Sequence, residues 1–593
     1  MRIPSQLGFL LLGKKLSLRA MRWLSRSPLS ENQITLFLAL LIGLSTGFVA
    51  VGFQQLMHFS QILFNNYASR GLEYIHAYMI LFLPCIGGLW AGIIIHYGSR
   101  DAKGHGVAEV MTAVAIAGGR IPMRVGVVKA LASALTIGSG GSAGAEGPIV
   151  QIGSSVGSSI GQLFQMSEAK LKLLVGCGVA AGISAIFNAP VAGVLFALEV
   201  ILGEFTTRVF SALVLSSVLA TVVSRAFFGN VPLLRVPSYG LIAVRELVLY
   251  LGLGLLIGVV AYAFHELLHR TESVFEKLRQ VRDPYKPALG GLLVGMVGMV
   301  VPLALGGSFE PISRALYGEF EIGLLLSLIL GKMLLTSLTL GSGGSGGVFS
   351  PCIFIGAMLG AAYGQVAGLL FPGLTAAAGA YAVVGMTACV AAAAQAPITA
   401  IIMGFELTND YRIMLPLMFG CVIATLVFNA FCKESIYTFK LKKRGIHVEG
   451  GRDQDIMRNL PIELAMNRQV LTVYDDTPIA DFVEQVQRSG HPTVPVLDRR
   501  DRLVGIISVH DVKLFRDATA TEALCVRNLM TSDHVETVFP DEKFSAALSS
   551  MSRRDLGRLP VVSRRDPKRM VGIVSRGDIL RAYDQELVRR HLA

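Results

Sequence analysis

One acidic residue stands alone in a long apolar stretch. Between Lys129 and Glu168, Glu146 is the only charged side chain. Such a carboxylate is costly inside a lipid bilayer and is a functional hypothesis by default. It lies in a glycine-rich turn before an expected apolar helix at 144–153, and free N–H groups at a helix start attract anions. We predict that Glu146 competes with an anion there until it is protonated, and so acts as a gate; the alternative is a carboxylate that only caps the helix.

The same turn occurs a second time. Residues 138–153 (GSGGSAGAEGPIVQIG) and 341–356 (GSGGSGGVFSPCIFIG) are identical at nine of 16 positions. Asn188-Ala189-Pro190 and Gln395-Ala396-Pro397 are each followed by a glutamate nine residues after the proline. Two halves therefore share one plan, and transporters built this way hold their site between the halves on discontinuous helices. A dinucleotide-binding loop is the rival interpretation of the first turn, but the strand and the later acidic residue that it requires are not evident.

The surrounding composition indicates that the helices cross a membrane. Hydrophobic residues make up 52% of the 593-residue chain and charged residues only 16%, against about 25% charged in soluble domains. The 73 residues of 333–405 contain no charge at all, and a spanning helix needs about 20 apolar residues. We predict a membrane domain over 34–440, after a basic segment at 1–33 that lies in the cytoplasm. The net charge of +12 then reflects positive-inside bias rather than binding of nucleic acid.

A second region begins where the composition becomes polar. A linker at 441–455 precedes residues 456–593, which contain a repeat of β-α-β-β-α outline over 456–516 and 525–588. We predict a small α/β tail of two similar modules. The seven cysteines show no paired or metal-type spacing, so no metal site is predicted. An enzymatic activity is not predicted either.

Several ordered motifs resemble one family. Gly144-Ala145-Glu146-Gly147-Pro148 resembles the GxEGP signature of the CLC chloride channels and transporters, and Gly347-Val348-Phe349-Ser350-Pro351 resembles its GxFxP signature. Residues 104–109 (GHGVAE) resemble the family's GSGIPE segment, while Lys129 and Tyr437 fall where the family has a lysine and its central tyrosine. The resemblance covers about residues 35–440, and the tail resembles a pair of CBS domains.

The resemblance implies a fold, an assembly and a site. The fold is an all-α polytopic membrane domain of roughly 17 to 18 helices in two inverted repeats, with an α/β CBS pair. The assembly is a homodimer in the plasma or inner membrane, with one anion pathway per subunit, chloride as the usual substrate and both termini in the cytoplasm. Glu146 is the gate, and the anion-binding residues are His105, Gly106, Gly144, Ala145, Gly147, Pro148, Gly347, Val348, Phe349, Pro351 and Tyr437. No cofactor is required, although an adenine nucleotide at the CBS pair would place phosphate on Ser508 or Ser575 and ribose on Asp511 or Asp578.

Two departures from the family pattern affect the anion. The family's central serine corresponds to His105. An imidazole still donates an N–H group and also gains a proton near neutral pH, which leaves the ranking of chloride and nitrate open; a structural histidine is the alternative. Ala145 replaces an arginine that is frequent in the family, and this weakens the local positive field.

A third departure concerns protons. Proton-coupled members usually carry a second, inner glutamate directly after the one matched by Glu199, and here that residue is Val200. Because valine transfers no proton, we predict gated, channel-like anion conduction. Glu204, expected one helical turn further on, is a candidate displaced proton donor. A chloride/proton antiporter and a membrane-anchored nucleotide sensor acting through the CBS pair are the two alternatives.

Overall fold

The chain folds into two compact units, residues 1–448 and 449–593. A computed structural model describes residues 30–69, 73–230, 234, 244–443, 460–489, 493–508, 511–512, 524–533, 535–553 and 556–591. The predicted basic segment (1–33) and linker (441–455) lie mostly outside these residues. Each unit is described by itself.

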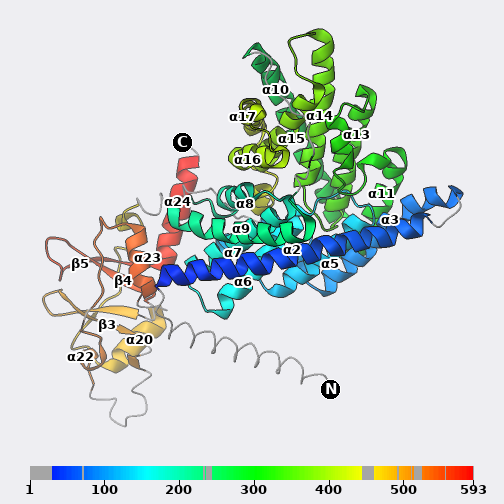
Figure 1. Cartoon of the computed structure of the whole chain (residues 1–593). Helices are drawn as coiled ribbons and strands as arrows, with labels where there is room; N and C mark the ends of the chain where they lie inside the picture. Colours follow the sequence, from blue (N-terminus) through cyan, green and yellow to red (C-terminus); the bar gives the residue numbers. More distant parts are fainter. Residues whose placement is uncertain are drawn as a thin grey trace, which may run out of the picture. The chain divides into compact units, whose positions relative to one another are not determined.

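The first unit is helical, as predicted (Figure 1). Its first half contains α2 (Glu31–Ser69), α3 (Glu73–Tyr97), α4 (Val107–Ile116), α5 (Met123–Gly138), α6 (Glu146–Leu163), α7 (Glu168–Phe187), α8 (Pro190–Phe196), a π-helical turn η2 (Ala197–Leu202) and α9 (Thr207–Phe228). Its second half contains α10 (Leu247–Lys277), α11 (Lys286–Val300), α12 (Glu310–Leu316), α13 (Ile322–Gly341), α14 (Phe349–Leu370), α15 (Ala378–Ala394), α16 (Pro397–Thr408), α17 (Met414–Phe431) and α18 (Thr438–Lys443). Short 3-10 turns are η1 (Arg100–Ala102), η3 (Val244–Glu246), η4 (Asp283–Tyr285), η5 (Pro302–Ala304) and η6 (Tyr411–Ile413).

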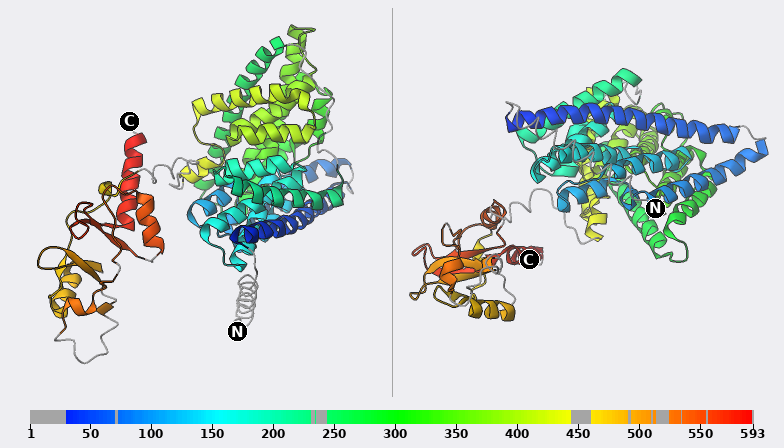
Figure 2. Two further views of the ribbon diagram at one scale, coloured as in Figure 1. Left: turned by 60° about the vertical axis from the view of Figure 1, so that its left-hand side comes forward. Right: turned by 90° about the horizontal axis from the view of Figure 1, so that it is seen from below.

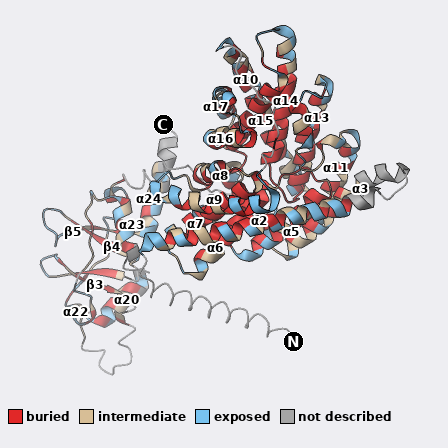
Figure 3. Ribbon diagram, viewed as in Figure 1, coloured by how far each residue is buried: buried red, intermediate tan, exposed pale blue. Residues whose placement is uncertain are grey.

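Long and short apolar helices alternate in this unit. Within the part of the chain that the structure describes, seven helices are long and apolar enough to cross a membrane. Others, including α4, α8 and α16, are too short to span. Figure 3 shows α14 and α15 as almost wholly buried, whereas α2 and α10 expose one side. Helices too short to span are tolerated in a bilayer where their ends lie within the protein or line a cavity.

The two halves run in opposite directions. In η2, which continues α8, the Glu199 carboxylate accepts hydrogen bonds from the N–H groups of Ile398 and Thr399, at 3.2 and 2.7 Å, where α16 begins. Near the end of α16, Glu406 accepts from the first N–H groups of α8, at 3.0 and 2.8 Å. Each of these equivalent segments therefore begins where the other ends. This antiparallel pairing confirms the inverted repeat, and Figures 1 and 2 show α5–α9 and α13–α17 as two separate groups.

The second unit has two small sheets, each with its own hydrophobic core. The first sheet pairs β1 (Val473–Tyr474) in parallel with β2 (Thr493–Leu497), and β2 antiparallel with β3 (Leu503–Ser508). The second pairs β4 (Arg558–Val562) antiparallel with β5 (Met570–Ser575). The helices are α20 (Ile479–Ser489), α22 (Val526–Leu529), α23 (Phe544–Arg553) and α24 (Arg576–His591), with the 3-10 turn η7 (Ile462–Leu464). The predicted α/β tail is confirmed.

The start of the tail packs away from the module to which the sequence assigns it. The N–H group of Ile462 donates to the carbonyl of Glu542 at 2.8 Å, and Asn467 exchanges two hydrogen bonds with Ile573. Leu460 and Ile462 are buried with Phe544 in the core of the second module. The opening residues of the predicted 456–516 module therefore complete the 525–588 module, because backbone pairing does not follow chain order.

Candidate anion-transport site

The two glycine-rich turns meet. Gly144 donates its N–H to the carbonyl of Gly347 at 2.9 Å, and Gly347 returns a hydrogen bond to Gly144 at 2.6 Å. Gly140 and Gly343, at equivalent places in the two turns, both have φ of +103°, a conformation that glycine adopts without strain. The starts of α6 and α14 are thereby held face to face, as the repeat predicted.

The Glu146 side chain crosses from one helix start to the other. It is 3% exposed, and its two carboxylate oxygens accept hydrogen bonds from the N–H and the hydroxyl of Ser350, each at 2.8 Å. These donors belong to the first turn of α14. A methyl group on Gly144 or Gly347 would come within 2.1 or 2.5 Å of this carboxylate. The glycines therefore make the space in which the Glu146 carboxylate occupies the start of α14, where free N–H groups favour a negative charge.

The loop with His105 packs onto the same place. A methyl group on Gly147 would lie 2.0 Å from the carbonyl oxygen of His105, and one on Gly106 would lie 2.8 Å from that of Gly147. The His105 ring is buried, 5.7 Å from the ring of Tyr437 between centroids. Neither of its nitrogens has a hydrogen-bond partner among the described residues. Buried polar groups are almost always paired, and the described residues supply no such pair to this ring.

The remaining predicted residues shape the two helix starts. Ala145 and Val348 are the capping residues of α6 and α14. Pro148 and Pro351 follow in the first turns, where a missing N–H costs no helical hydrogen bond. Phe349 is buried, and its ring packs near the rings of Phe187 and Phe196, at 5.5 and 6.4 Å. All of the predicted anion-site segments thus come together.

A buried lysine positions the His105 loop. The ammonium of Lys129 donates to the carbonyl oxygens of Ala102 and Gly104, at 3.1 and 2.5 Å. Lys332 makes the same two bonds in the second half, to carbonyl oxygens at 3.1 and 2.7 Å. Lysine at these two positions holds each loop by its backbone. The sequence analysis missed Lys332, although its equivalence to Lys129 follows from the repeat.

The coupling positions lie in η2 and just beyond its end. Val200 lies in η2, half-buried against the core. The helix ends at Leu202, Gly203 turns left-handed with φ of +66°, and Glu204 lies exposed beyond it. The prediction that Glu204 is one helical turn from Val200 is therefore wrong, because glycine at 203 ends the helix.

The predicted nucleotide residues form two local caps. Ser508 donates its N–H and hydroxyl to Asp511 at 2.8 and 2.7 Å, and Ser575 does the same to Asp578 at 3.0 and 2.6 Å. Burial alone would raise the pKa of Asp578, but these hydrogen bonds and the Arg581 guanidinium lower the pKa below its usual value. In this structure both serine hydroxyls are thus engaged within the chain.

Two further groups near the site were missed. Ser350 lies within the second motif, but the motif itself does not mark its hydroxyl as a donor to Glu146. Lys440 forms a 2.7 Å ion pair with Glu109, and the two side chains are 13% and 9% exposed. This pair joins α18 to α4 beneath the His105 loop, a contact between distant segments that no local pattern reveals.

Two inverted halves that meet at buried, anion-accepting helix starts define a membrane protein for anion transport. The comparisons with known proteins agree. The sequence profile of the family "Voltage gated chloride channel" matches residues 87–429, and that of the CBS domain matches 462–516 and 526–585. The chain belongs to the voltage gated chloride channel family.

Several relatives carry specific names. A protein of Ralstonia nicotianae named as a ClcB-like chloride channel protein is 35% identical over 61% of this chain and 85% of its own length. An "H(+)/Cl(-) exchange transporter ClcA" of Salmonella typhimurium is 32% identical over 68% of this chain and 87% of its own length. Among solved structures, a "slow cyanobacterial Cl-/H+ antiporter" is 27% identical with a TM-score of 0.65, over 70% of this chain and 98% of that one.

Proposed function

We propose that this protein exchanges chloride for protons across the membrane. The observation that carries the proposal is the Glu146 carboxylate bound by the N–H and hydroxyl of Ser350 at the start of α14. The start of α14, which we call the seat, offers the donors that a dehydrated chloride would use. The carboxylate and the anion therefore compete for the seat. The exchanger named ClcA and the cyanobacterial antiporter support exchange over simple conduction.

The chemistry follows from the charge of one side chain. As a carboxylate, Glu146 fills the seat and closes the pathway. When it takes up a proton it loses its charge, its hydrogen bonds from Ser350 weaken, and chloride replaces it in the seat. The proton then leaves on the other side as the carboxylate returns. Glu146 therefore takes part in the movement of both the proton and chloride. The two movements are linked because the seat holds one negative charge at a time.

His105 and Tyr437 complete the proposed pathway. Their rings lie 5.7 Å apart, next to the backbone that carries Gly147. The two unpartnered nitrogens of His105 give the anion an N–H donor where the family pattern has a hydroxyl. We extend the proposal to the assembly that the resemblance implies, a homodimer with cytoplasmic termini, which chemical cross-linking and mass determination in detergent would test.

Passive, gated conduction is the second candidate function. Val200 favours it, because an apolar side chain stands where coupled relatives have the inner glutamate and Glu204 is not on the helix. The ClcB-like relative carries the name of a channel protein.

One experiment separates the two. Purified protein in liposomes is given a chloride gradient, and chloride and pH are recorded together. Exchange predicts uphill proton movement at a constant ratio of protons to chloride. Chloride flux that leaves the proton gradient unchanged would refute exchange and establish conduction.

A further inference from the structure

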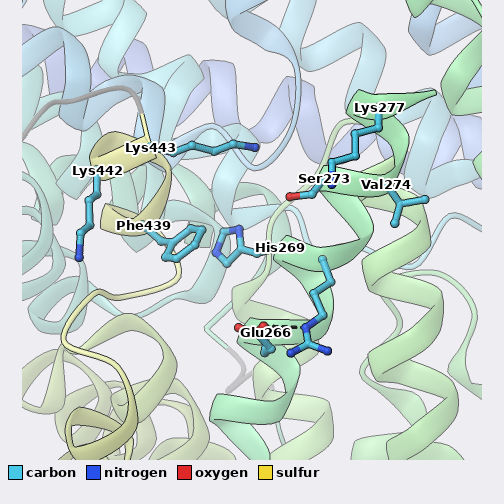
Figure 4. A pocket seen from close by; sticks show the side chains of 9 residues that line it. Glu266, His269, Ser273, Val274, Lys277, Phe439, Lys442 and Lys443 are labelled. Carbon is cyan, nitrogen blue, oxygen red and sulfur yellow. Dashed lines mark hydrogen bonds and ion pairs between the residues drawn. The ribbon is translucent and has the colours of Figure 1, made fainter. Parts of the chain in front are cut away.

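A cavity of about 630 Å³ opens beside the end of α10. Figure 4 shows side chains of α10, such as Ser273 and Lys277, on one side and side chains of α18, such as Phe439 and Lys443, on the other. The helix α18 is the last one described in the first unit. We call this space the α10 cavity. It is lined by Glu266, His269, Arg270, Ser273, Val274, Lys277, Phe439, Lys442 and Lys443.

The lining of the α10 cavity carries an excess of positive charge. Four of its side chains are arginine or lysine, and three of these have carboxylate partners. The three ion pairs are Arg270 with Glu266, Lys442 with Glu434, and Lys443 with Glu276. The fourth cation, Lys277, is exposed in the last turn of α10 and has no carboxylate partner among the described residues. Because each pair is neutral overall, the cavity presents one uncompensated positive charge.

A serine hydroxyl beside this charge is also without a partner. Two residues earlier on α10, Thr271 donates its hydroxyl to the carbonyl of Leu267 at 2.8 Å, which is a common bond for a hydroxyl within a helix. Ser273 makes no such bond, and its hydroxyl has no other partner in the described part of the chain. Ser273 and Lys277 are four residues apart and therefore lie on one face of the helix. Their hydroxyl and ammonium groups are donors of the kind that phosphate oxygens accept.

An apolar stripe leads along α10 to the cavity. This helix is long and apolar enough to cross a membrane, and its exposed side chains Leu251, Leu255 and Val259 recur every fourth residue. Arg270 follows Val259 by 11 residues, about three turns, so both lie on the same side, and Val274 one turn further is 63% exposed. The rise from Val259 to Arg270 is about 16 Å, roughly half of the hydrocarbon core of a bilayer. An acyl chain lying along the stripe therefore reaches from the middle of the bilayer to the cavity.

We propose that the α10 cavity binds the headgroup of an anionic phospholipid, with the phosphate at Lys277 and Ser273 and an acyl chain on the stripe of α10. The single uncompensated positive charge matches a headgroup that carries one negative charge. Basic pockets on the cytoplasmic side of membrane helices bind such headgroups in other proteins, and a cytoplasmic tail, as proposed above, puts α18 on that side. The proposal holds whether chloride transport is exchange or conduction.

Two other occupants fit the cavity less well. A soluble phosphate ester could use the same donors, but it would leave the exposed Val274 and the apolar stripe uncovered. A second copy of the chain could cover the stripe, but the cores of subunit interfaces are depleted of charged residues, whereas this stripe ends at the cationic lining of the cavity. A lipid uses both the charge and the apolar surface.

The test measures lipid binding to the full-length protein in detergent by native mass spectrometry. Wild type should bind phosphatidylglycerol, which has one negative charge, more tightly than phosphatidylcholine, which has no net charge. Lys277→Gln should weaken binding of phosphatidylglycerol about fivefold, the size expected for one lysine near an anionic headgroup. Ser273→Ala should weaken it about tenfold, as expected for one hydrogen bond to a charged group. Lys433→Gln is the matched control, because Lys433 is exposed between α17 and α18 but does not line the cavity.

The outcomes are distinct. Wild-type affinity for phosphatidylglycerol in both cavity variants would overturn the proposal, and so would an equal loss in Lys433→Gln, which would indicate binding to the positive surface in general. Displacement of the lipid by an equal concentration of glycerol 3-phosphate would make a soluble phosphate ester the ligand instead. Binding of the lipid to single chains but not to dimers would assign the stripe to a second copy. Chloride flux in liposomes checks that each variant is folded, and if Lys277→Gln is not, Ser273→Ala decides the question.

Discussion

Ser350→Ala tests the proposed competition between Glu146 and chloride with a change of one hydroxyl group. The variant keeps the backbone N–H that donates to Glu146 but removes the hydroxyl that donates to the second carboxylate oxygen at 2.8 Å. A hydrogen bond to a charged group contributes about 1.5–3 kcal/mol. We take the low end of this range, because the Ser350 hydroxyl can also donate to a bound chloride. The substitution then removes a hydrogen bond from both the carboxylate and the chloride. If the Glu146 carboxylate binds at the start of α14 about 1.4 kcal/mol less favourably, the apparent affinity for chloride rises about tenfold.

The assay is chloride binding by isothermal titration calorimetry at neutral pH, followed by the chloride dependence of flux. We expect an apparent chloride affinity about tenfold tighter in Ser350→Ala. Thr399→Val is the matched control, since Thr399 gives an N–H and a hydroxyl to Glu199, at 2.7 and 2.6 Å, in the same arrangement at another helix start. It should lower stability by about 1 kcal/mol and leave chloride affinity unchanged. Equal affinity in Ser350→Ala and the wild type, or an equal gain in both variants, would refute the competition between Glu146 and chloride.

Three other changes test the remaining parts of the site and the tail. Glu146→Gln should leave the seat open, so that chloride flux loses its pH dependence and proton coupling disappears; a flux with wild-type pH dependence would contradict this. His105→Ser should keep transport but change the chloride/nitrate ratio measured by flux, and an identical ratio and pH dependence would make His105 structural. In the tail, the pKa of Asp578 in the folded protein is lowered below the ordinary aspartate value of about 3.8. Its carboxylate therefore stabilises the fold above that pH. This contribution to the free energy of unfolding is lost as the pH falls through and below that value. Thermal melts of residues 450–593 should therefore show Asp578→Asn less stable than wild type at neutral pH, with the difference closing towards pH 3, and a constant difference would be inconsistent with it.

The sequence predicted the helices and turns of this protein better than the contacts between them. The glycine-rich turns and the repeat were sufficient to predict a membrane fold of two related halves, and Glu146 is buried at a helix start as the motif indicates. They were not sufficient to predict the partner of Glu146, because Ser350 is 204 residues away and only the antiparallel pairing of the two turns brings it to that carboxylate. The error at Glu204 came from continuing a helix past Gly203, where a left-handed residue ends it.

The function that we propose depends on a difference between the two halves of the repeat. The repeat keeps Lys129 and Lys332 in the same role, and it keeps Glu199 and Glu406 as reciprocal holders of the partner helix. At the helix starts the alignment instead sets Glu146 against Phe349 and Gly147 against Ser350. The start of α6 therefore supplies a carboxylate, and the start of α14 supplies the hydrogen-bond donors for it. A single negative charge thus lies between the two halves. Two glutamates at these positions would place two like charges in one seat, and two phenylalanines would leave the seat open to any anion. In the function that we propose, this difference between the two helix starts is what lets one carboxylate control access to the donors of the other.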